Sequence, residues 1–169
     1  MKIAIIGNAG SGKSTLGVQL HQKLNIPLYH LDQYFWKPGW QEPDRRKFEE
    51  IHTTLCDQDE WIIEGMAARY VEYRVAQADV VIYLDVPTHV CLYRIFKRAI
   101  LYFGSVHFAQ AKDCPERGPS LKFLKYVLNF NKTRRPLIEA VLLKHRHLKK
   151  LFIIKSRADL RTLMENIGS

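Results

Sequence analysis

The chain has 169 residues, of which 47% are hydrophobic and 25% are charged. This length and composition predict a single folded domain and exclude a largely disordered chain. The charge is uneven, because residues 1–90 contain 9 Lys and Arg against 12 Asp and Glu, whereas residues 91–169 contain 17 against 5. The basic second half either attracts phosphate groups, on a nucleotide, a nucleic acid or a lipid, or forms solvated helix faces.

The three cysteines, Cys56, Cys91 and Cys114, have no paired spacing, which argues against a disulfide framework or a zinc site. Such cysteines fit a reducing, cytoplasmic compartment. No apolar run approaches the ~20 residues that a membrane-spanning helix needs, so we expect no membrane partner.

Strands and helices alternate along the first 90 residues. Short apolar runs rich in β-branched residues predict strands, and apolar residues at helical spacing, such as Leu16, Leu20 and Leu24, predict helices. Proline and glycine breakers predict a loop over residues 32–45. The regular elements expected here are strands at 2–6, 27–31, 61–64 and 79–84 and helices at 13–24 and 44–57.

The second half is expected to be mostly helical. Its predicted elements are a helix at 88–103, a loop at 104–119, a helix from about residue 120, a strand at 151–155 and a helix at 158–166. Pro136 either kinks the long helix or lies in the first turn of a new one. Five apolar strands separated by helices predict an α/β fold, with a parallel sheet covered by helices on both faces.

A glycine-rich motif follows the first predicted strand. It has the pattern GxxxxGK[ST] and comprises Gly7, Asn8, Ala9, Gly10, Ser11, Gly12, Lys13, Ser14 and Thr15. Its glycines allow the backbone N–H groups to form an anion nest at a helix N-terminus, and this strand-and-helix context identifies a P-loop. Lys13 can then reach the β- and γ-phosphates, and the Ser14 hydroxyl can ligate Mg²⁺. The motif predicts binding of ATP or GTP with Mg²⁺.

Together with this loop, the stretch Leu84-Asp85-Val86-Pro87, followed by Arg94 and Arg98, resembles the adenylate-kinase-like small-molecule kinases. Nearly the whole chain is similar to the family called topology modulation protein (FlaR-like). The matching segments are the P-loop, Tyr29-His30-Leu31-Asp32, Phe35-Trp36-Lys37-Pro38-Gly39-Trp40, Trp61-Ile62-Ile63-Glu64-Gly65, Arg74, Cys91-Leu92-Tyr93-Arg94, Arg134-Arg135-Pro136 and Lys155-Ser156-Arg157. The resemblance implies a P-loop NTPase fold, ATP rather than GTP, and one domain over 1–169 with a basic helical lid within about 88–135.

Several charged residues are candidates for the phosphate and metal site. Asp85 ends a predicted strand, where a carboxylate can hold Mg²⁺ or simply cap the next helix. Arg94 and Arg98 are one helical turn apart, and the resemblance to lid arginines implies that they stabilise the transferring phosphoryl group. The alternative for these arginines is a solvated basic face, and the same choice applies to Arg134 and Arg135.

The acceptor side is expected over residues 32–40. Asp32 follows the second strand, so it should face the crevice at the carboxyl ends of the strands and could accept a proton from an attacking hydroxyl. The run from Asp32 to Pro38 is similar to stretches of nicotinamide riboside kinases and uridine kinases, which implies that Asp32 is the base and that Phe35 or Trp36 stacks on a nucleobase. The alternative is an aromatic mini-core with Asp32 capping a turn.

Three further residues around the third strand are acceptor candidates. Glu64 could bind an acceptor hydroxyl or orient a water molecule, and Arg69 and Arg74 could bind an acceptor phosphate. The run from Gly65 to Arg69 departs from the Gly-Phe-Pro-Arg pattern of adenylate kinases, which weakens AMP as the acceptor.

Three functions follow from these observations. We favour an ATP- and Mg²⁺-dependent phosphotransferase that acts on a small nucleoside- or nucleotide-like acceptor. The basic second half leaves open a nucleotide-gated protein that binds nucleic acid and modulates DNA topology, or a polynucleotide 5′-end kinase, although no nucleic-acid-reading motif is recognisable. A nucleotide switch without transfer chemistry would leave Asp32 and Glu64 unexplained.

Overall fold

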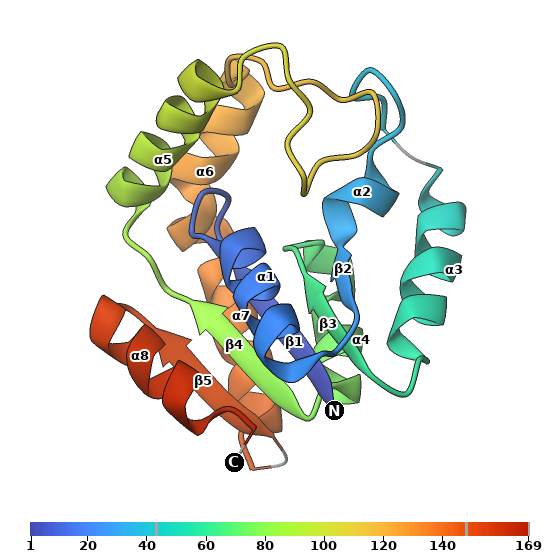
Figure 1. Ribbon diagram of the computed structural model, residues 1–169, viewed down its shortest axis with the longest axis vertical. Helices are drawn as coiled ribbons and strands as arrows, with labels where there is room; N and C mark the ends of the chain where they lie inside the picture. The colour runs from blue at the N-terminus through green and yellow to red at the C-terminus, as the bar shows by residue number, and fades with distance from the viewer. Residues whose placement is uncertain (43, 148, 169) are drawn as a thin grey trace.

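The computed structural model describes residues 1–42, 44–147 and 149–168. Its centre is a parallel sheet of five strands in the order β2-β3-β1-β4-β5 (Figure 1). The strands are β1 (Lys2–Gly7), β2 (Leu28–His30), β3 (Trp61–Glu64), β4 (Val80–Leu84) and β5 (Lys150–Ile154). The predicted α/β fold is confirmed, and each predicted strand is present to within one residue at either end.

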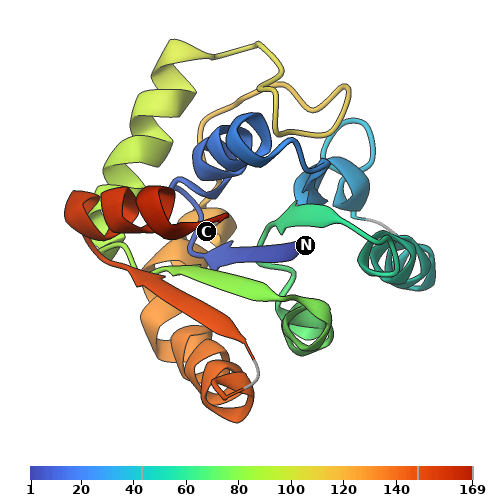
Figure 2. The same ribbon diagram turned by 60° about the horizontal axis from the view of Figure 1, so that its bottom comes forward.

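Helices cover both faces of the sheet because alternate strand side chains point to opposite sides. Ala4 and Ile6 of β1 face one core, and Ile3 and Ile5 face the other. The first core is closed by α3 (Arg45–Cys56), α4 (Val71–Gln77) and α7 (Arg135–His145), and the second by α1 (Lys13–Leu24) and α8 (Arg157–Asn166). Figure 2 shows α1 and α8 on one side of the sheet and α4 and α7 on the other.

The predicted helical second half is present in detail. It contains α5 (Thr88–Leu101), α6 (Leu121–Thr133), α7 and α8, and residues 102–120 form an irregular loop between α5 and α6. Pro136 lies in the first turn of α7, so it begins a new helix instead of kinking a long one. The region 88–135, where a basic helical lid is expected, thus contains a helix pair joined by this loop.

Two short helical segments were not predicted. A single turn, α2 (Leu31–Phe35), occupies the start of the expected loop at 32–45, and the 3₁₀ turn η1 (Ala68–Tyr70) leads into α4. Both are too short for apolar periodicity to reveal them.

The strand ends bring the candidate residues together. Gly7 ends β1, His30 ends β2 and Glu64 ends β3, and Asp85 follows β4 directly. Parallel strands place all of these positions at one edge of the sheet, which is where ligands bind in open α/β folds. Among the described residues, no helix is both long enough and apolar enough to cross a bilayer.

Candidate nucleotide and acceptor site

The P-loop connects β1 to α1 in a conformation suited to phosphate. Gly10 and Gly12 have φ values of 76° and 104°. α1 begins at Lys13 with no side-chain cap and no acidic residue in its first turn, so its first amide groups are available to an anion. The buried hydroxyl of Ser11 has no hydrogen-bond partner. These features fit the phosphates of a nucleotide.

The P-loop is packed so closely against α5 that Gly10 leaves no space for a side chain. A Cβ atom there would lie 2.4 Å from the carbonyl oxygen of Cys91. We expect Gly10→Ala to lower the free energy of unfolding by about 2–4 kcal/mol, because it adds backbone strain and forces α5 outward. Urea unfolding followed by circular dichroism measures the change.

Gly104→Ala is the matched control for this variant. Gly104 has the same φ of 76°, but no atom lies within 4 Å of the added Cβ. It should lose only the backbone contribution, about 1–2 kcal/mol. Equal losses in the two variants would contradict the importance of the contact with α5.

Helices α5 and α6 both hold the P-loop. Asn8 donates from Nδ2 to the carbonyl of Val127 on α6 at 3.1 Å. Arg94 donates from Nη1 to the carbonyl of Ser11 at 2.8 Å, so the structure places this predicted lid arginine against the P-loop backbone. The Lys13 ammonium donates to the Asn8 carbonyl at 2.8 Å and thus spans the loop.

Glu64 is buried against the P-loop. Its Oε1 accepts a hydrogen bond from the Ser14 hydroxyl at 2.8 Å and lies 2.7 Å from Nδ1 of His30. Burial alone would raise the pKa of Glu64, but the hydrogen bond from His30 and the charge of Lys13 outweigh burial and lower that pKa. Glu64 is therefore a carboxylate that orients Ser14, and its expected contact with an acceptor hydroxyl or a water molecule stays a prediction.

Asp32 lies in the first turn of α2, beside this cluster. Asp32 is exposed at the carboxyl end of the sheet, and protein groups packed near its carboxylate displace part of the surrounding water. Desolvation and the nearby charge of Glu64 raise the pKa of Asp32 to about 6, although the charges of Lys13 and Arg98 oppose this shift. A carboxylate with a pKa near neutrality and a position beside the phosphate-binding lysine is suited to accept a proton.

Arg98 connects α5 to the 102–120 loop. Its Nε lies 2.7 Å from Oε2 of the buried Glu116, which also accepts a hydrogen bond from Gln110 at 2.8 Å. Arg98 also lies close enough to Asp32 to affect its pKa. The structure therefore brings Arg98 near Asp32, with Glu116 beside its guanidinium.

The 102–120 loop is docked on the segment from β2 to Gln41, and Figure 1 shows it passing above α2. Gln33 donates to the carbonyl of Phe108 at 2.7 Å, and the Trp40 indole donates to the carbonyl of Pro115 at 3.0 Å. The backbone N–H of Gly39 donates to the carbonyl of Asp113 at 3.0 Å. The loop therefore lies against the residues that follow Asp32 in the chain.

Phe35 and Trp36 have different surroundings. The ring of Phe35 packs edge-on against Phe48, a residue of the core, with the centroids 5.0 Å apart. Trp36 packs against Trp40 at 5.7 Å, next to the 102–120 loop. The aromatic run is thus partly core, and Trp36 is the member that borders the loop.

Asp85 is paired with Arg135 and not with Ser14. Its Oδ2 accepts from Nη2 of Arg135 at 2.9 Å, and its side chain is mostly buried. The carboxylate that contacts Ser14 is Glu64. The expectation that Asp85 holds Mg²⁺ stays a prediction, and in the structure its carboxylate forms an ion pair with Arg135 of α7.

Arg74 is fully buried and does not face the crevice. It donates from Nη2 to the carbonyl of Gly65 at 2.6 Å, and desolvation lowers its pKa to about 10. The expected binding of an acceptor phosphate by Arg74 is therefore corrected: this guanidinium holds the turn after β3. Arg69 in η1 is exposed, so it remains accessible to an anion.

The fit of Mg²⁺ depends on a bound nucleotide. Within 1–42, 44–147 and 149–168, no group of three or more His, Cys, Asp or Glu side chains is placed to hold a metal ion. Mg²⁺ commonly takes few protein ligands and completes its shell with phosphates and water. Ser14 meets that requirement as the protein ligand, with its hydroxyl proton directed to Glu64.

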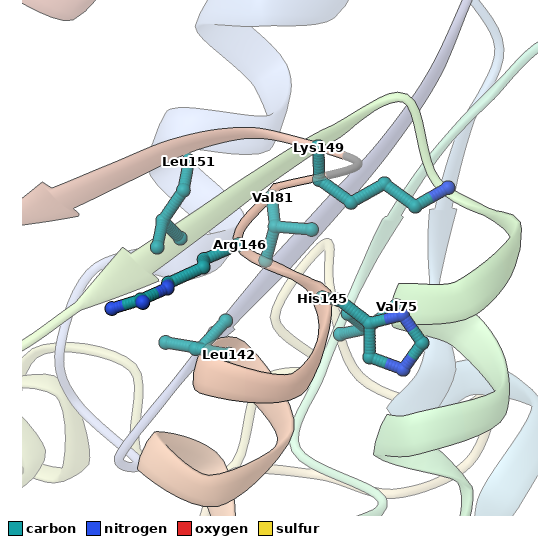
Figure 3. A pocket seen from close by; sticks show the side chains of 7 residues that line it. All are labelled: Val75, Val81, Leu142, His145, Arg146, Lys149 and Leu151. Carbon is teal, nitrogen blue, oxygen red and sulfur yellow. The ribbon is translucent and has the colours of Figure 1, made fainter.

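A separate indentation lies away from this edge of the sheet. Residues of α4, β4, α7, β5 and the connection between α7 and β5 line it, among them Val75, Leu142 and Lys149 (Figure 3). Apolar and basic side chains surround it, and it is too tight for a water molecule, so it is a packing defect.

Sequence patterns predict no role for two residues of the site, His30 and Glu116. His30 lies in a segment similar to the topology modulation protein family, and Glu116 lies in a predicted loop. The position of His30 at the end of a predicted strand, next to Asp32, was a usable signal for it. Glu116 carried no such signal, because its partner Arg98 is 18 positions away in the sequence.

Comparisons with known proteins agree with this architecture. The protein YqaC of Bacillus subtilis (strain 168) is 31% identical over 107 residues, which are 61% of this chain and 59% of YqaC. The chain thus matches less than two thirds of that relative's length. Shikimate kinase from Aquifex aeolicus has a TM-score of 0.58 at 19% identity, with both chains fully covered.

Two further solved structures are similar over nearly their full length. Shikimate kinase from Acinetobacter baumannii has a TM-score of 0.60 at 17% identity and covers 99% of this chain and 95% of its own. Deoxyadenosine kinase from M. mycoides with bound dATP has a TM-score of 0.57 at 18% identity, with both chains fully covered. A family model described as an AAA domain matches residues 3–100, more than half of the chain. The chain therefore belongs to the AAA domain family and has the P-loop fold of these kinases.

Proposed function

We propose that this protein is an ATP- and Mg²⁺-dependent phosphotransferase that acts on a small nucleoside- or nucleotide-like acceptor. The observation that carries the proposal is the position of Asp32. Asp32 is exposed, its carboxylate lies within electrostatic reach of Lys13, and desolvation raises the pKa of this carboxyl to about 6. A nucleotide switch needs no such group, whereas transfer to a hydroxyl needs a base beside the phosphates.

The roles of the other residues follow from their positions. The P-loop amides from Gly7 to Thr15 and the Lys13 ammonium bind the phosphates. Arg94 of α5 contacts the backbone of the same loop. Ser14 ligates Mg²⁺, which when bound neutralises charge on the phosphate oxygens. Asp32 takes the proton of the acceptor hydroxyl, and Arg98 provides positive charge beside it. The 102–120 loop limits access of water to the crevice.

The proposed nucleoside- or nucleotide-like acceptor rests on the aromatic side chains of Trp36 and Trp40 and on the resemblance to nucleoside kinases. Trp36 and Trp40 border the crevice next to the docked loop, where a planar base could stack. The exposed Arg69 is the remaining candidate for an acceptor phosphate. The same proposal includes membership of the topology modulation protein family and a preference for ATP over GTP. It also includes a single domain over residues 1–169.

A transfer screen tests the proposal. Purified protein is incubated with Mg²⁺ and γ-labelled ATP in the presence of nucleosides, nucleoside monophosphates, small vitamins, or DNA and RNA 5′ ends. We expect label in one small acceptor. Hydrolysis without transfer to any of them would favour a nucleotide switch.

A second candidate function, binding of nucleic acid, is favoured by the charge of two helices. α5 contains Arg94, Lys97 and Arg98, α6 contains Lys122, Lys125 and Lys132, and neither contains an acidic residue. Tyr93 and Phe103 are exposed on the same helix pair and its connection. If this surface binds DNA, the logarithm of the binding constant should fall with log salt concentration by about 0.7–0.9 per phosphate contact. Lys122→Ala should then reduce the slope by about one contact, and an unchanged slope would exclude Lys122 from the interface.

A further inference from the structure

His30 and Glu64 form a buried pair across neighbouring strands. They are direct partners in the register of β2 and β3, at the carboxyl end of each strand. His30 is 7% exposed and Glu64 is 4% exposed. A carboxylate can only accept hydrogen bonds, so the 2.7 Å contact between Nδ1 and Oε1 requires the proton on Nδ1 of His30.

The same carboxylate oxygen controls the hydroxyl of Ser14. Ser14 Oγ donates to Oε1 of Glu64 at 2.8 Å, so the direction of its proton is fixed. The lone pairs of Oγ are then free on the sides away from Glu64. If His30 did not donate, the buried Glu64 carboxylate would lose one of its two partners, and its position against Ser14 would loosen.

The ring of His30 is itself held by the 102–120 loop. Phe108 packs edge-to-face against it, with the centroids 5.6 Å apart and an interplanar angle of 70°. The backbone of Phe108 is fixed in turn by the hydrogen bond from Gln33. The imidazole therefore has a defined orientation as well as a defined partner.

We propose that His30 is a positioning residue for the Mg²⁺ ligand of the nucleotide site: it fixes Glu64, and Glu64 directs the lone pairs of Ser14 toward the metal. The inference rests on the proposed function, because it needs Mg²⁺ to be bound together with ATP. It assigns a role to a residue that does not touch the substrate. Partners of this kind, one step removed from the metal, typically change metal affinity or activity by about 10–100-fold.

Two substitutions separate the hydrogen bond from the packing. His30→Phe keeps a ring against Phe108 but has no donor for Glu64. His30→Asn places an amide N–H near the former Nδ1 and keeps the donor while it removes the ring. For each protein, calorimetry measures the dissociation constant of ATP in EDTA and in excess Mg²⁺. The constant in EDTA divided by the constant in Mg²⁺ reports the contribution of the metal.

We expect His30→Phe to lower this ratio by about tenfold or more, and His30→Asn to stay within about threefold of the wild type. ATP affinity in EDTA should be the same in all three proteins. A wild-type ratio in His30→Phe, or equal losses in both variants, would overturn the inference and leave the proposed function intact. A wild-type protein that binds ATP equally well with and without Mg²⁺ would overturn both.

A second measurement does not depend on the folding of a variant. In the wild-type protein, nitrogen-15 NMR of the histidine rings should show Nδ1 of His30 protonated and protected from exchange with solvent. Because Oε1 of Glu64 accepts a hydrogen bond from this N–H group, Glu64→Gln should shift the Nδ1 resonance of His30. A His30 ring protonated only on Nε2 would overturn the inference.

Discussion

Asp32→Asn is expected to lower the rate of phosphoryl transfer by about 10²–10⁴-fold while it leaves the affinity for ATP unchanged. The amide keeps the size of the carboxylate and cannot accept the proton of an attacking hydroxyl. Steady-state transfer and calorimetric ATP binding, measured on the same preparation, separate the two quantities. Asp59→Asn is the matched control, because Asp59 is an exposed residue of the turn before β3. Wild-type transfer in Asp32→Asn would exclude Asp32 as the base.

The pH dependence of transfer gives the same test without a substitution. Asp32 acts as a base only when ionised, and its pKa is about 6, so kcat/KM should rise with pH through about 6 and then level off.

The stability of the folded protein should change with pH in the opposite direction. The folded-state pKa is above the ordinary value of 3.8, so the folded protein binds this proton more tightly and gains stability as pH falls from 7 toward 4. Asp32→Asn should therefore melt at a higher temperature than the wild type at pH 7.5, and the difference should shrink at pH 5.

Lys13→Ala is expected to abolish transfer to within the background, a loss of at least about 10²–10³-fold. The variant removes the ammonium that spans the P-loop, and with it the positive charge that we propose binds the β- and γ-phosphates. It should also lose the rise in melting temperature that saturating ATP gives the wild type, because a ligand stabilises only the protein that binds it.

The control for this variant is Lys47→Ala, which removes one exposed positive charge from α3. It should keep both the transfer activity and the thermal shift. The loss of the contact between Lys13 and Asn8 costs about 1 kcal/mol of stability, too little to unfold the domain. Substantial transfer by a folded Lys13→Ala protein would contradict the proposed phosphate site.

The sheet and the P-loop could be predicted because local patterns encode them. Each strand is an apolar run of three to six residues, and the loop between β1 and α1 carries its glycines at fixed spacing. The start of α3 could also be predicted, because Asp44 is its N-cap and accepts a hydrogen bond from the backbone N–H of Arg46. Such signals are contained in a few consecutive residues.

The contacts of the charged residues could not be predicted in the same way. The partner of Asp85 is Arg135, 50 positions away, and the partner of Glu64 is Ser14 at the same separation. Whether Arg74 points toward solvent or into the core depends on how α4 packs under the sheet. The residues next to Arg74 in the sequence do not indicate this orientation. The sequence identified residue types suited to phosphate and metal chemistry, and only the tertiary arrangement selected among them.

The docking of the 102–120 loop has a consequence for how proteins of this kind can diverge. Three of its contacts with the segment from β2 to Gln41 use the loop's backbone carbonyls, at Phe108, Asp113 and Pro115. Such contacts depend on the path of the chain and tolerate a change of side chain at the accepting residue. Positions such as Asp113 and Pro115 can therefore change while the loop stays attached, whereas the side chains of Phe108 and Glu116 contact His30 and Arg98. Selection for a new acceptor could act on this segment first, with the nucleotide-binding half of the site left unchanged.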